Sequence, residues 1–301
     1  MTKKDLQGKV AVITGSGSGI GKATAIALAD RGVKVVIGDI SEINGETTTR
    51  EINEKFDGTK VAVFQKTDVT KYKDNIELFQ RAEKEFGGVD IAYLNAGVGK
   101  PWISAFTDLN DEDDENIFNI NVMGVVKGTK AALLHLVKRG GGIIINTAST
   151  GGFSSFLDAN SYCASKHAVV GWTRGFDIMP QIANIRINAV CPGFVDTNFM
   201  TTASGDQDNP PPWYQTHSIM SRTKIETVVE TVLKFIEDES LNGETLLALP
   251  GGVIRPQPRP EALPECLTPE YIEATTKTQT DSIDFYRKML NSALEKYEKS
   301  T

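Results

Sequence analysis

The sequence is poor in the residues that build metal sites and disulfide frameworks. Its 301 residues include only three cysteines and three histidines. Cys163, Cys191 and Cys266 are not spaced as metal ligands, and their odd number favours free thiols in a reducing compartment. The three histidines have no carboxylate at metal-ligand spacing. We therefore expect no metal cofactor and no disulfide-stabilised secreted domain.

Excess positive charge and membrane-length apolar runs are also missing. The formal net charge is −7, which offers no basic surface to nucleic acid or to an anionic membrane. No apolar run in the sequence reaches the length of a membrane span. The charged start, Met1 to Asp5, shows no secretory signal. These absences favour a cytoplasmic protein with neither a nucleic-acid nor a membrane partner.

What the chain does have is a regular alternation of apolar β-branched runs and helical stretches. The runs lack an apolar–polar alternation, which is typical of strands buried on both faces of a parallel sheet. Helical patterning separates them, for example over Ile20–Arg31, Thr70–Phe86 and Asn116–Lys138. This order predicts an α/β fold, a single doubly wound Rossmann-type sheet of about seven strands with helices on both faces. The expected strands are Val10–Thr14, Val33–Asp39, Val61–Gln65, Ile91–Asn95, Ile143–Thr147, Ile185–Val190 and Thr245–Leu249.

The pattern divides the chain into a domain over residues 1–252 and a Pro-rich extension over residues 253–301. The extension is expected to end in a helix at about Asp281–Lys299. One face of that helix is apolar, with Ile283, Tyr286, Leu290, Ala293 and Tyr297. This face could dock on its own subunit or on a partner subunit, and the sequence favours neither.

A glycine-rich loop follows the first expected strand. The segment Thr14-Gly15-Ser16-Gly17-Ser18-Gly19-Ile20-Gly21 leads directly into a helix. Glycines let the backbone approach a pyrophosphate, and the helix N-terminus offers it free N–H groups. The position between a strand and a helix predicts a dinucleotide site with Gly15, Ser18, Gly19 and Ile20 at the phosphates.

Asp39 ends the second expected strand, where an acid can accept hydrogen bonds from the adenosine ribose. A ribose 2′-phosphate would meet a like charge there. No Arg or Lys at Ser16, Ser18, Ile40 or Ser41 would offset that repulsion. The sequence therefore predicts NAD rather than NADP, the alternative being that Asp39 only caps a strand.

These residues resemble the classical short-chain dehydrogenase/reductase family. The spacing Thr-Gly-x-x-x-Gly-Ile-Gly is similar to that family's loop, and Leu94-Asn95-Ala96-Gly97 to its Asn-Asn-Ala-Gly. The likeness runs from about Leu6 to Gly252, with Leu249-Pro250 where Val-Asp is usual. In motif wording it is nearest to the 15-hydroxyprostaglandin dehydrogenase group, from which the long Pro-rich tail departs. By resemblance the remaining cofactor-binding residues are Asp68, Val69, Asn95, Ala96, Gly97, Pro192, Gly193, Val195 and Thr197, together with Tyr162 and Lys166.

Tyr162 and Lys166 are spaced i and i+4, which places them on one face of a helix. A free tyrosine, with a pKa near ~10, is a poor base at neutral pH. A nearby ammonium and a positive nicotinamide ring favour phenolate and would lower that pKa. Tyr162 could then exchange a proton with the substrate oxygen. Without the surrounding motifs, the same pair would be read as an ordinary surface pair.

Two more catalytic residues follow from the resemblance. Ser149 precedes Tyr162 at the family's spacing, and its hydroxyl can hold the substrate oxygen. Thr147 and Thr150 are rival hydroxyls at the wrong spacing. Asn121 matches the family's helix asparagine, which holds a water in a proton relay from the lysine. Asn119 is a rival assignment, and a purely structural role for Asn121 stays open.

The resemblance implies an oxidoreductase that moves a hydride between NAD(H) and a secondary alcohol or ketone. Residues 194–222 are expected to form a substrate lid. Its aromatic residues Phe194, Phe199, Trp213 and Tyr214 would wall a pocket for a mostly apolar small molecule. A homodimer or homotetramer is expected through the helices that carry Asn121 and Tyr162. The alternative is a catalytically weak NAD(H)-binding sensor or scaffold protein, although such proteins usually lose Tyr or Lys.

Overall fold

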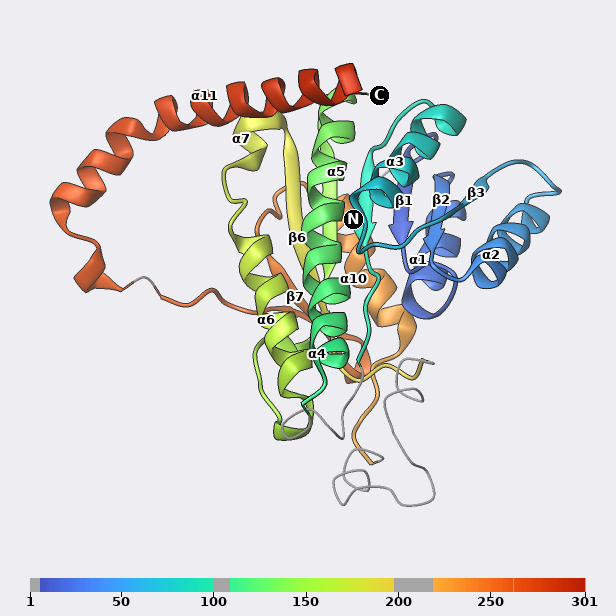
Figure 1. Cartoon of the computed structure of the whole chain (residues 1–301). Coiled ribbons are helices and arrows are strands. Elements are labelled where there is room, and N and C mark those ends of the chain that lie inside the picture. Colours follow the sequence, from blue (N-terminus) through green and yellow to red (C-terminus); the bar gives the residue numbers. More distant parts are fainter. Residues whose placement is uncertain (1–5, 100–108, 198–218, 262, 301) are drawn as a thin grey trace.

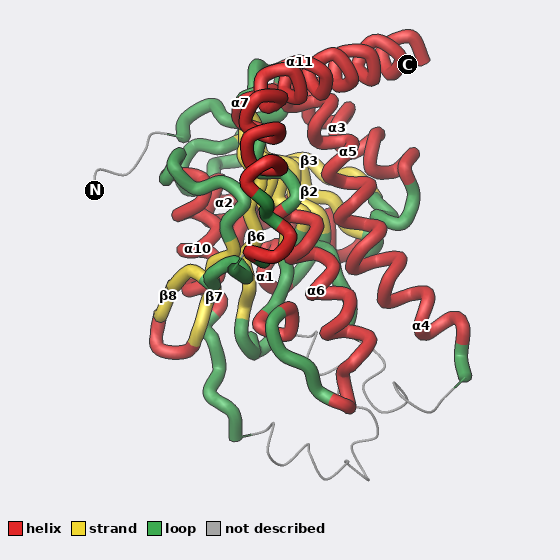
Figure 2. The backbone as a smooth tube through the Cα atoms, turned by 90° about the vertical axis from the view of Figure 1, so that its left-hand side faces the viewer, coloured by secondary structure: helices red, strands yellow, loops and turns green. Residues whose placement is uncertain are grey.

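The structure, a computed structural model, describes residues 6–99, 109–197, 219–261 and 263–300. One eight-stranded sheet runs through the molecule in the order β3-β2-β1-β4-β5-β6-β7-β8 (Figures 1 and 2). The first seven strands pair in parallel, and β8 pairs with β7 in antiparallel fashion. The strands are β1 (Val10–Thr14), β2 (Lys34–Asp39), β3 (Ala62–Lys66), β4 (Ile91–Leu94), β5 (Gly142–Thr147), β6 (Ile185–Pro192), β7 (Thr245–Leu249) and β8 (Val253–Pro256).

The expected fold class is confirmed, but one strand was missed. The sequence pattern predicted about seven strands, and the structure adds β8. Val253 and Arg255 on this edge strand are exposed, so β8 lacks the continuous apolar run that marks the buried strands. The pattern of apolar runs therefore does not predict β8.

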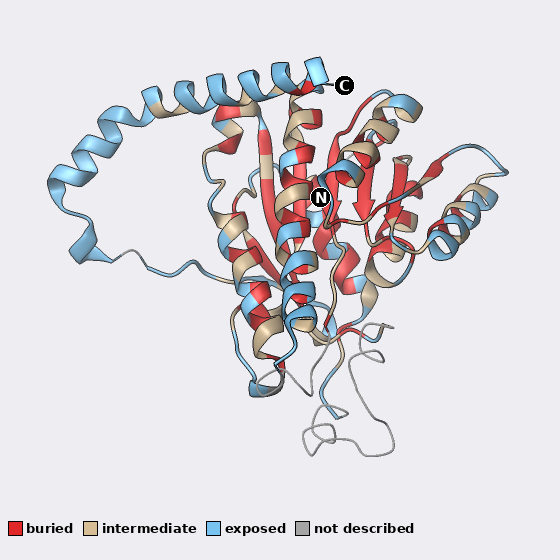
Figure 3. Ribbon diagram, in the orientation of Figure 1, coloured by how far each residue is buried: buried red, intermediate tan, exposed pale blue. Residues whose placement is uncertain are grey.

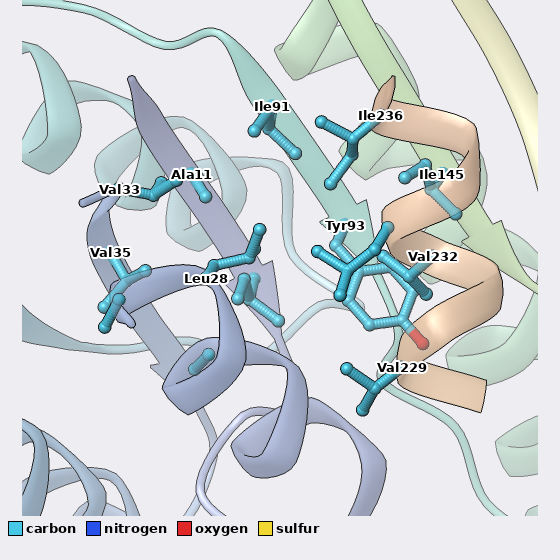
Figure 4. Packing of buried hydrophobic residues seen from close by; sticks show 14 of the residues in the cluster. Ala11, Leu28, Val33, Val35, Ile91, Tyr93, Ile145, Val229, Val232 and Ile236 are labelled. Atoms are coloured by element: carbon cyan, nitrogen blue, oxygen red, sulfur yellow. The ribbon is translucent and has the colours of Figure 1, made fainter. Parts of the chain in front are cut away.

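Helices cover both faces of the sheet, as the pattern predicted. On one face, α1 and α10 pack against the sheet, with Leu28 of α1 and Val232 of α10 beside Tyr93 of β4 (Figure 4). On the other, α3 and α5 pack against strand residues that alternate with these, such as Val10 and Val12. The helices are α1 (Gly19–Ala29), α2 (Glu42–Lys55), α3 (Tyr72–Phe86), α4 (Asp111–Phe118), α5 (Gly124–Lys138), α6 (Asn160–Arg174), α7 (Met179–Ala183), α10 (Ile225–Glu237) and α11 (Pro269–Ser300).

β2 and β3 lie on one side of β1, and β4 and the later strands lie on the other, so the direction in which strands are added reverses at β1. In open α/β sheets a crevice forms at such a switch point, outside the carboxyl ends of the strands. The loops that carry the sequence motifs follow β1, β2, β3, β4, β5 and β6 at that end. The fold therefore gathers them around one crevice.

One helical stretch has the length and apolarity of a membrane span. An 18-residue window within Asp111–Lys138 has a mean hydropathy of 1.2, so the expectation that no stretch reaches this length is wrong. The stretch combines α4, a π-helical turn over Asn119–Met123, and α5. Half of that window is buried within the structure, and α5 packs against the sheet, as expected for a core helix.

The extension crosses the opposite end of the molecule from the motif loops. α11 is a 32-residue helix that begins before the expected start near Asp281. Its C-terminal half docks on its own subunit, where Ile283 and Leu290 pack against the core and Tyr297 is buried. Tyr286 and Ala293 of the predicted apolar face are exposed. The division of the chain after Gly252 stays a prediction.

Candidate active site

The loop between β1 and α1 is shaped by close backbone contacts. Gly15 and Gly19 have φ values of +62° and +53°, which favour glycine. A Cβ at Gly15 would lie 2.8 Å from the Cα of Ala96, so only glycine fits there. Ser18, at the N-cap of α1, makes no side-chain capping bond, and the first turn holds no acid. The positive end of the helix is thus open to an anion.

Asp39 ends β2 and lies beside this loop. Its Oδ2 accepts a hydrogen bond from the N–H of Gly17 at 2.8 Å, and its Oδ1 accepts one from Ser41 at 2.9 Å. The strand-end cap that was considered for Asp39 therefore exists. Each carboxylate oxygen can accept a further hydrogen bond, and Asp39 lines the crevice. The cap and a ribose site are compatible.

The side chain of Asn95, just after β4, links the carboxyl ends of β1, β4 and β5 by hydrogen bonds. Its Nδ2 donates to the carbonyls of Thr14 and Gly15 at 3.2 and 3.1 Å. Its Oδ1 accepts from the hydroxyl of Thr147 at 3.3 Å. The Oγ1 of Thr14 in turn accepts from the N–H groups of Asn95 and Ala96. Thr14 is thus a supporting residue, to which the sequence motif gave no role of its own.

Asp68 and Val69 line the crevice beside Asn95 and Gly97. The Oδ1 of Asp68 accepts hydrogen bonds from the N–H and hydroxyl of Thr70 at 3.0 and 2.7 Å. Burial acts to raise the pKa of Asp68, but hydrogen bonds from Thr70 and Lys71 outweigh it and hold that pKa below its usual value. The carboxylate therefore orders its own loop, which leaves Val69 as an apolar surface of the crevice.

Asn121 lies behind the crevice rather than on its wall. It is fully buried in the π-helical turn, where its Oδ1 accepts from the N–H of Val98 at 2.8 Å. Its Nδ2 donates to the Val98 carbonyl at 2.9 Å and to the Ser165 hydroxyl at 3.0 Å. The side chain thus clamps the loop after β4 to α6. π-helical turns often occur at functional sites.

Ser149, Tyr162 and Lys166 meet at the end of the crevice beyond β5. The Oγ of Ser149 accepts from the N–H of Gly151 at 3.1 Å and is hydrogen-bonded to Tyr162. Lys166 donates to the Thr147 carbonyl at 2.9 Å, and its Nζ lies 5.7 Å from the ring centroid of Tyr162. Gly97 leaves space beside this ammonium group, since a Cβ at that position would lie 3.4 Å from the Nζ of Lys166.

The electrostatics of the protein alone differ from the expectation. Burial raises the pKa of Tyr162 to about 12, although the hydrogen bond with Ser149 lowers it. Burial also lowers the pKa of Lys166 to about 8. The predicted lowering of the tyrosine pKa by this lysine is therefore not present in the protein alone. The ammonium is held toward the Thr147 carbonyl, and desolvation dominates both groups.

These residues border one crevice of about 380 Å³. The structure brings every predicted cofactor-binding residue to its wall, together with Ser149 and Phe194. Sequence reasoning assigned no site role to several other wall residues, most of which are apolar or small, and it considered Thr147 and Thr150 only as rivals of Ser149. These are Ile40, Thr67, Val98, Ile120, Thr147, Ala148, Thr150, Gly151, Phe156, Ala159 and Cys163.

The chain segments at the two ends of the predicted lid, near Phe194 and Arg222, contact each other. Val195 forms a parallel bridge with Thr223, whose N–H donates to the Phe194 carbonyl at 2.7 Å. The guanidinium of Arg222 lies 3.3 Å from the carboxylate of Asp196 and 5.8 Å from the ring centroid of Phe194. Phe199, Trp213 and Tyr214 lie outside the described residues. Among the residues that the structure describes, no cluster of His, Cys, Asp and Glu could hold a metal ion.

Comparison with known proteins identifies the family. The profile described as "short chain dehydrogenase" matches residues 9–208. The mouse 15-hydroxyprostaglandin dehydrogenase [NAD(+)] is 32% identical over 249 residues, covering 79% of this chain and 88% of the relative. The cis-4-hydroxycyclohexanecarboxylate dehydrogenase of Sinomonas cyclohexanicum is 36% identical over 198 residues, covering 66% of this chain and 78% of the relative.

Solved structures agree. The 3-ketoacyl-(acyl-carrier-protein) reductase of Brucella melitensis, solved with NADH, superposes with a TM-score of 0.71 at 29% identity. The superposition covers 82% of this chain and 99% of that one. The chain belongs to the short-chain dehydrogenase/reductase family. The predicted family, fold class, enzyme class and cofactor NAD are thereby confirmed.

Proposed function

We propose that this enzyme interconverts a secondary alcohol and a ketone in the crevice, with NAD(H) as hydride carrier and Tyr162 as the proton-transfer group. One observation carries the proposal. The hydrogen-bonded pair of Ser149 and Tyr162 lies at one end of the same crevice that has Asp39 on its wall. A dinucleotide that places its ribose at Asp39 would extend toward this pair.

The residues of the crevice fit NAD on two counts. The contacts of Gly15 with Ala96 leave no room for a side chain in the phosphate loop, and the α1 N-terminus is uncapped by a side chain. We assign the phosphates to the loop from Gly15 to Ile20 and the ribose to Asp39. Asp68 and Val69 would hold the adenine, and Asn95–Gly97, Tyr162, Lys166 and the turn from Pro192 to Thr197 would hold the nicotinamide side. When bound, NAD⁺ accepts the hydride, and its positive ring favours a phenolate nearby.

The protein's own part is to hold the substrate oxygen and to move a proton. The Ser149 hydroxyl positions that oxygen, and the Tyr162 Oη takes or returns its proton. Because burial holds the pKa of Tyr162 near 12 in the protein alone, the phenolate requires added positive charge. The positive ring of bound NAD⁺ would supply it beside Lys166, whose Nζ lies 5.7 Å from the centroid of the Tyr162 ring. Asn121 holds the adjoining Val98 loop in place. Asn121 would also hold a water in a proton relay from Lys166.

The substrate side of the crevice is mostly apolar. Phe156, Ala159, Cys163 and Phe194 line it near Tyr162. We propose that the substrate is a mostly apolar small molecule and that Phe199, Trp213 and Tyr214 complete its pocket. The names of the relatives are consistent with this size class, since they include a hydroxyprostaglandin and a hydroxycyclohexanecarboxylate dehydrogenase.

We also propose a cytoplasmic homodimer or homotetramer that packs through the helices bearing Asn121 and Tyr162. Phe118 and Met123 support this, because both are large apolar residues that are more than a third exposed near Asn121. The same surface would be buried in such an assembly.

A binding and turnover assay tests the proposed function. NADH should bind with quenching of protein fluorescence, and a panel of apolar secondary alcohols should reduce NAD⁺. NADH binding without turnover on any alcohol or ketone would favour the sensor alternative. Absence of NADH binding would contradict both.

A further inference from the structure

The first half of α11 has no support from the rest of the protein. Residues 269–281 are exposed on every side, and the helix projects beyond the domain (Figures 1 and 3). This segment carries Thr275, Thr276, Thr278 and Thr280, whose β-branched side chains are poor helix formers. Isolated helices shorter than about 12–15 residues are marginal in water. A helix in this position therefore points to a packing partner.

The exposed face of this helix carries residues at coiled-coil spacing, here called the α11 stripe. Its members are spaced four, three, four, three and four residues apart, the spacing of a and d positions. Its large residues are open to solvent, with exposures of 54% for Tyr271, 60% for Phe285 and 55% for Met289. The complete α11 stripe is Tyr271, Thr275, Thr278, Ser282, Phe285 and Met289.

The threonines of the α11 stripe are apolar on their outer side. The hydroxyl of Thr275 donates to the Tyr271 carbonyl at 2.9 Å, and that of Thr278 donates to the Ala274 carbonyl at 3.0 Å. Both hydroxyls are thus satisfied within the helix. Their methyl groups remain for packing.

The α11 stripe is separate from the docked face of the same helix. Ile283, Leu290 and Tyr297 pack on the subunit's own core, whereas the stripe lies about a quarter turn away. Asp281, Ser282, Phe285 and Tyr286 surround a hollow on the stripe side.

We propose that the α11 stripe pairs with the α11 stripe of a second copy of this chain, antiparallel about a two-fold axis near residue 280. In that register Tyr271 lies opposite the partner's Met289. Thr275 lies opposite the partner's Phe285, and Thr278 opposite the partner's Ser282. A d position faces an a position in every layer, and no two of the large aromatic residues meet. A surface that matches itself in this way forms a closed, isologous contact.

The charges on one flank of the stripe favour the same arrangement. Glu270 comes near the partner's Lys288, and Lys277 comes near the partner's Asp281 and Asp284. A parallel pair in register would instead align each of these charges with its own copy. Asp281 does approach the partner's Asp281 at the axis, and the two Lys277 side chains lie within one turn to offset that repulsion. The match is with itself, which selects a second copy over an unrelated protein.

Cross-linking tests the pairing and its direction. In a Cys266→Ser background, which leaves only the buried Cys163 and Cys191, Thr278→Cys and Ser282→Cys proteins are prepared separately and oxidised alone or mixed. The mixture should form a covalent dimer several-fold more efficiently than either protein alone. No covalent dimer in the mixture overturns the pairing. Equal cross-linking by each protein alone overturns the antiparallel direction.

Sedimentation tests the energetics with a matched control. Phe285→Glu places a charge in the stripe and should weaken the α11 association roughly 30-fold, as expected for an interface anchor. Thr280→Glu adds the same charge to an exposed position outside the stripe and should leave the association unchanged. Equal average masses for both variants would overturn the proposal. Dehydrogenase activity is not part of either readout, so failure here leaves the proposed function intact.

Discussion

The two ends of the sheet are built in different ways. At the carboxyl end, Asn95 alone bonds to Thr14, Gly15 and Thr147, so three strand ends are fixed by one side chain. At the amino end, α11 contacts the domain with Ile283 and Leu290, which pack against the core, whereas its residues 269–281 are exposed on every side. The first end is cross-linked by side-chain hydrogen bonds and carries the proposed chemistry, whereas α11 lies at the opposite end of the molecule from the proposed catalytic residues.

One buried polar cluster nevertheless fastens α11 to the domain. The Nδ1 of His135 lies 2.7 Å from a carboxylate oxygen of Glu83, and its Nε2 lies 3.2 Å from the hydroxyl of Tyr297. That hydroxyl also accepts from Gln80 at 3.1 Å. Arg287 adds hydrogen bonds to the carbonyls of Gln181 and Ile182 in α7. We therefore expect that a substitution at one end of the sheet changes activity or local stability at that end and leaves the other end unchanged.

The largest effect is expected at the carboxyl end. Tyr162→Phe keeps the ring and removes the proton acceptor, so kcat should fall about 10²–10⁴-fold. NADH affinity and the melting temperature should stay near wild type. Steady-state kinetics with the best alcohol measure the effect, and Tyr286→Phe at an exposed position of α11 is the matched control. A variant that keeps more than about a tenth of wild-type kcat would show that Tyr162 does not transfer the proton.

A smaller change is expected in cofactor choice. The wild-type kcat/KM for NAD should exceed that for NADP by at least about tenfold to a hundredfold, because the 2′-phosphate would meet the Asp39 carboxylate. Asp39→Ala with Ile40→Arg should narrow or reverse this ratio, since a guanidinium can bind phosphate with two hydrogen bonds. Ile40 is 66% exposed at the crevice wall, so the new side chain has room. Equal use of both cofactors by the wild type would show that Asp39 does not face the ribose.

At the amino end, truncation of Tyr297 should affect stability and not chemistry. Tyr297→Ala removes a ring that is only 8% exposed and leaves His135 and Gln80 without their shared partner. The cost should be about 1–3 kcal/mol of local stability in residues 283–300. Hydrogen exchange of that segment reports it, with Lys296→Ala as the exposed control. A parallel loss of kcat would refute the independence of the two ends.

The smallest effect is a pH dependence at the same contact. Burial holds the pKa of His135 below its usual value, against the opposing effect of Glu83 and with a further lowering by Lys138. The folded state therefore prefers the neutral ring. The stabilisation is complete above the unfolded pKa of about 6.5 and declines as the pH falls toward the lower folded value.

The hydrogen exchange of residues 283–300 should accordingly be faster at about pH 5.5 than at about pH 7.5, once both rates are corrected for the pH dependence of intrinsic exchange. His135→Gln removes the titrating group at this position and should abolish that extra acceleration. An unchanged pH response in this variant would assign the effect to other groups, of which Glu83 and Lys138 lie nearest.

The sequence was informative where a residue type is required by local backbone geometry. Gly15 and Gly19 need their positive φ values, and Tyr162 and Lys166 share a helix face, so these motifs together with the family resemblance located the crevice. It was silent where packing between distant segments decides. The clamp of Asn121 on Val98, the contact of His135 with Tyr297 and the edge strand β8 depend on partners far along the chain. A single sequence does not specify such pairs.

The fate of the carbinol hydrogen tests the central claim most directly. A secondary alcohol that the enzyme accepts is labelled with deuterium on its carbinol carbon and incubated with unlabelled NAD⁺. The account predicts that the NADH formed carries the deuterium and that Tyr162→Phe forms almost none. NADH without the label, or labelled NADH formed equally well by Tyr162→Phe, would contradict hydride transfer in this crevice with Tyr162 as the proton-transfer group.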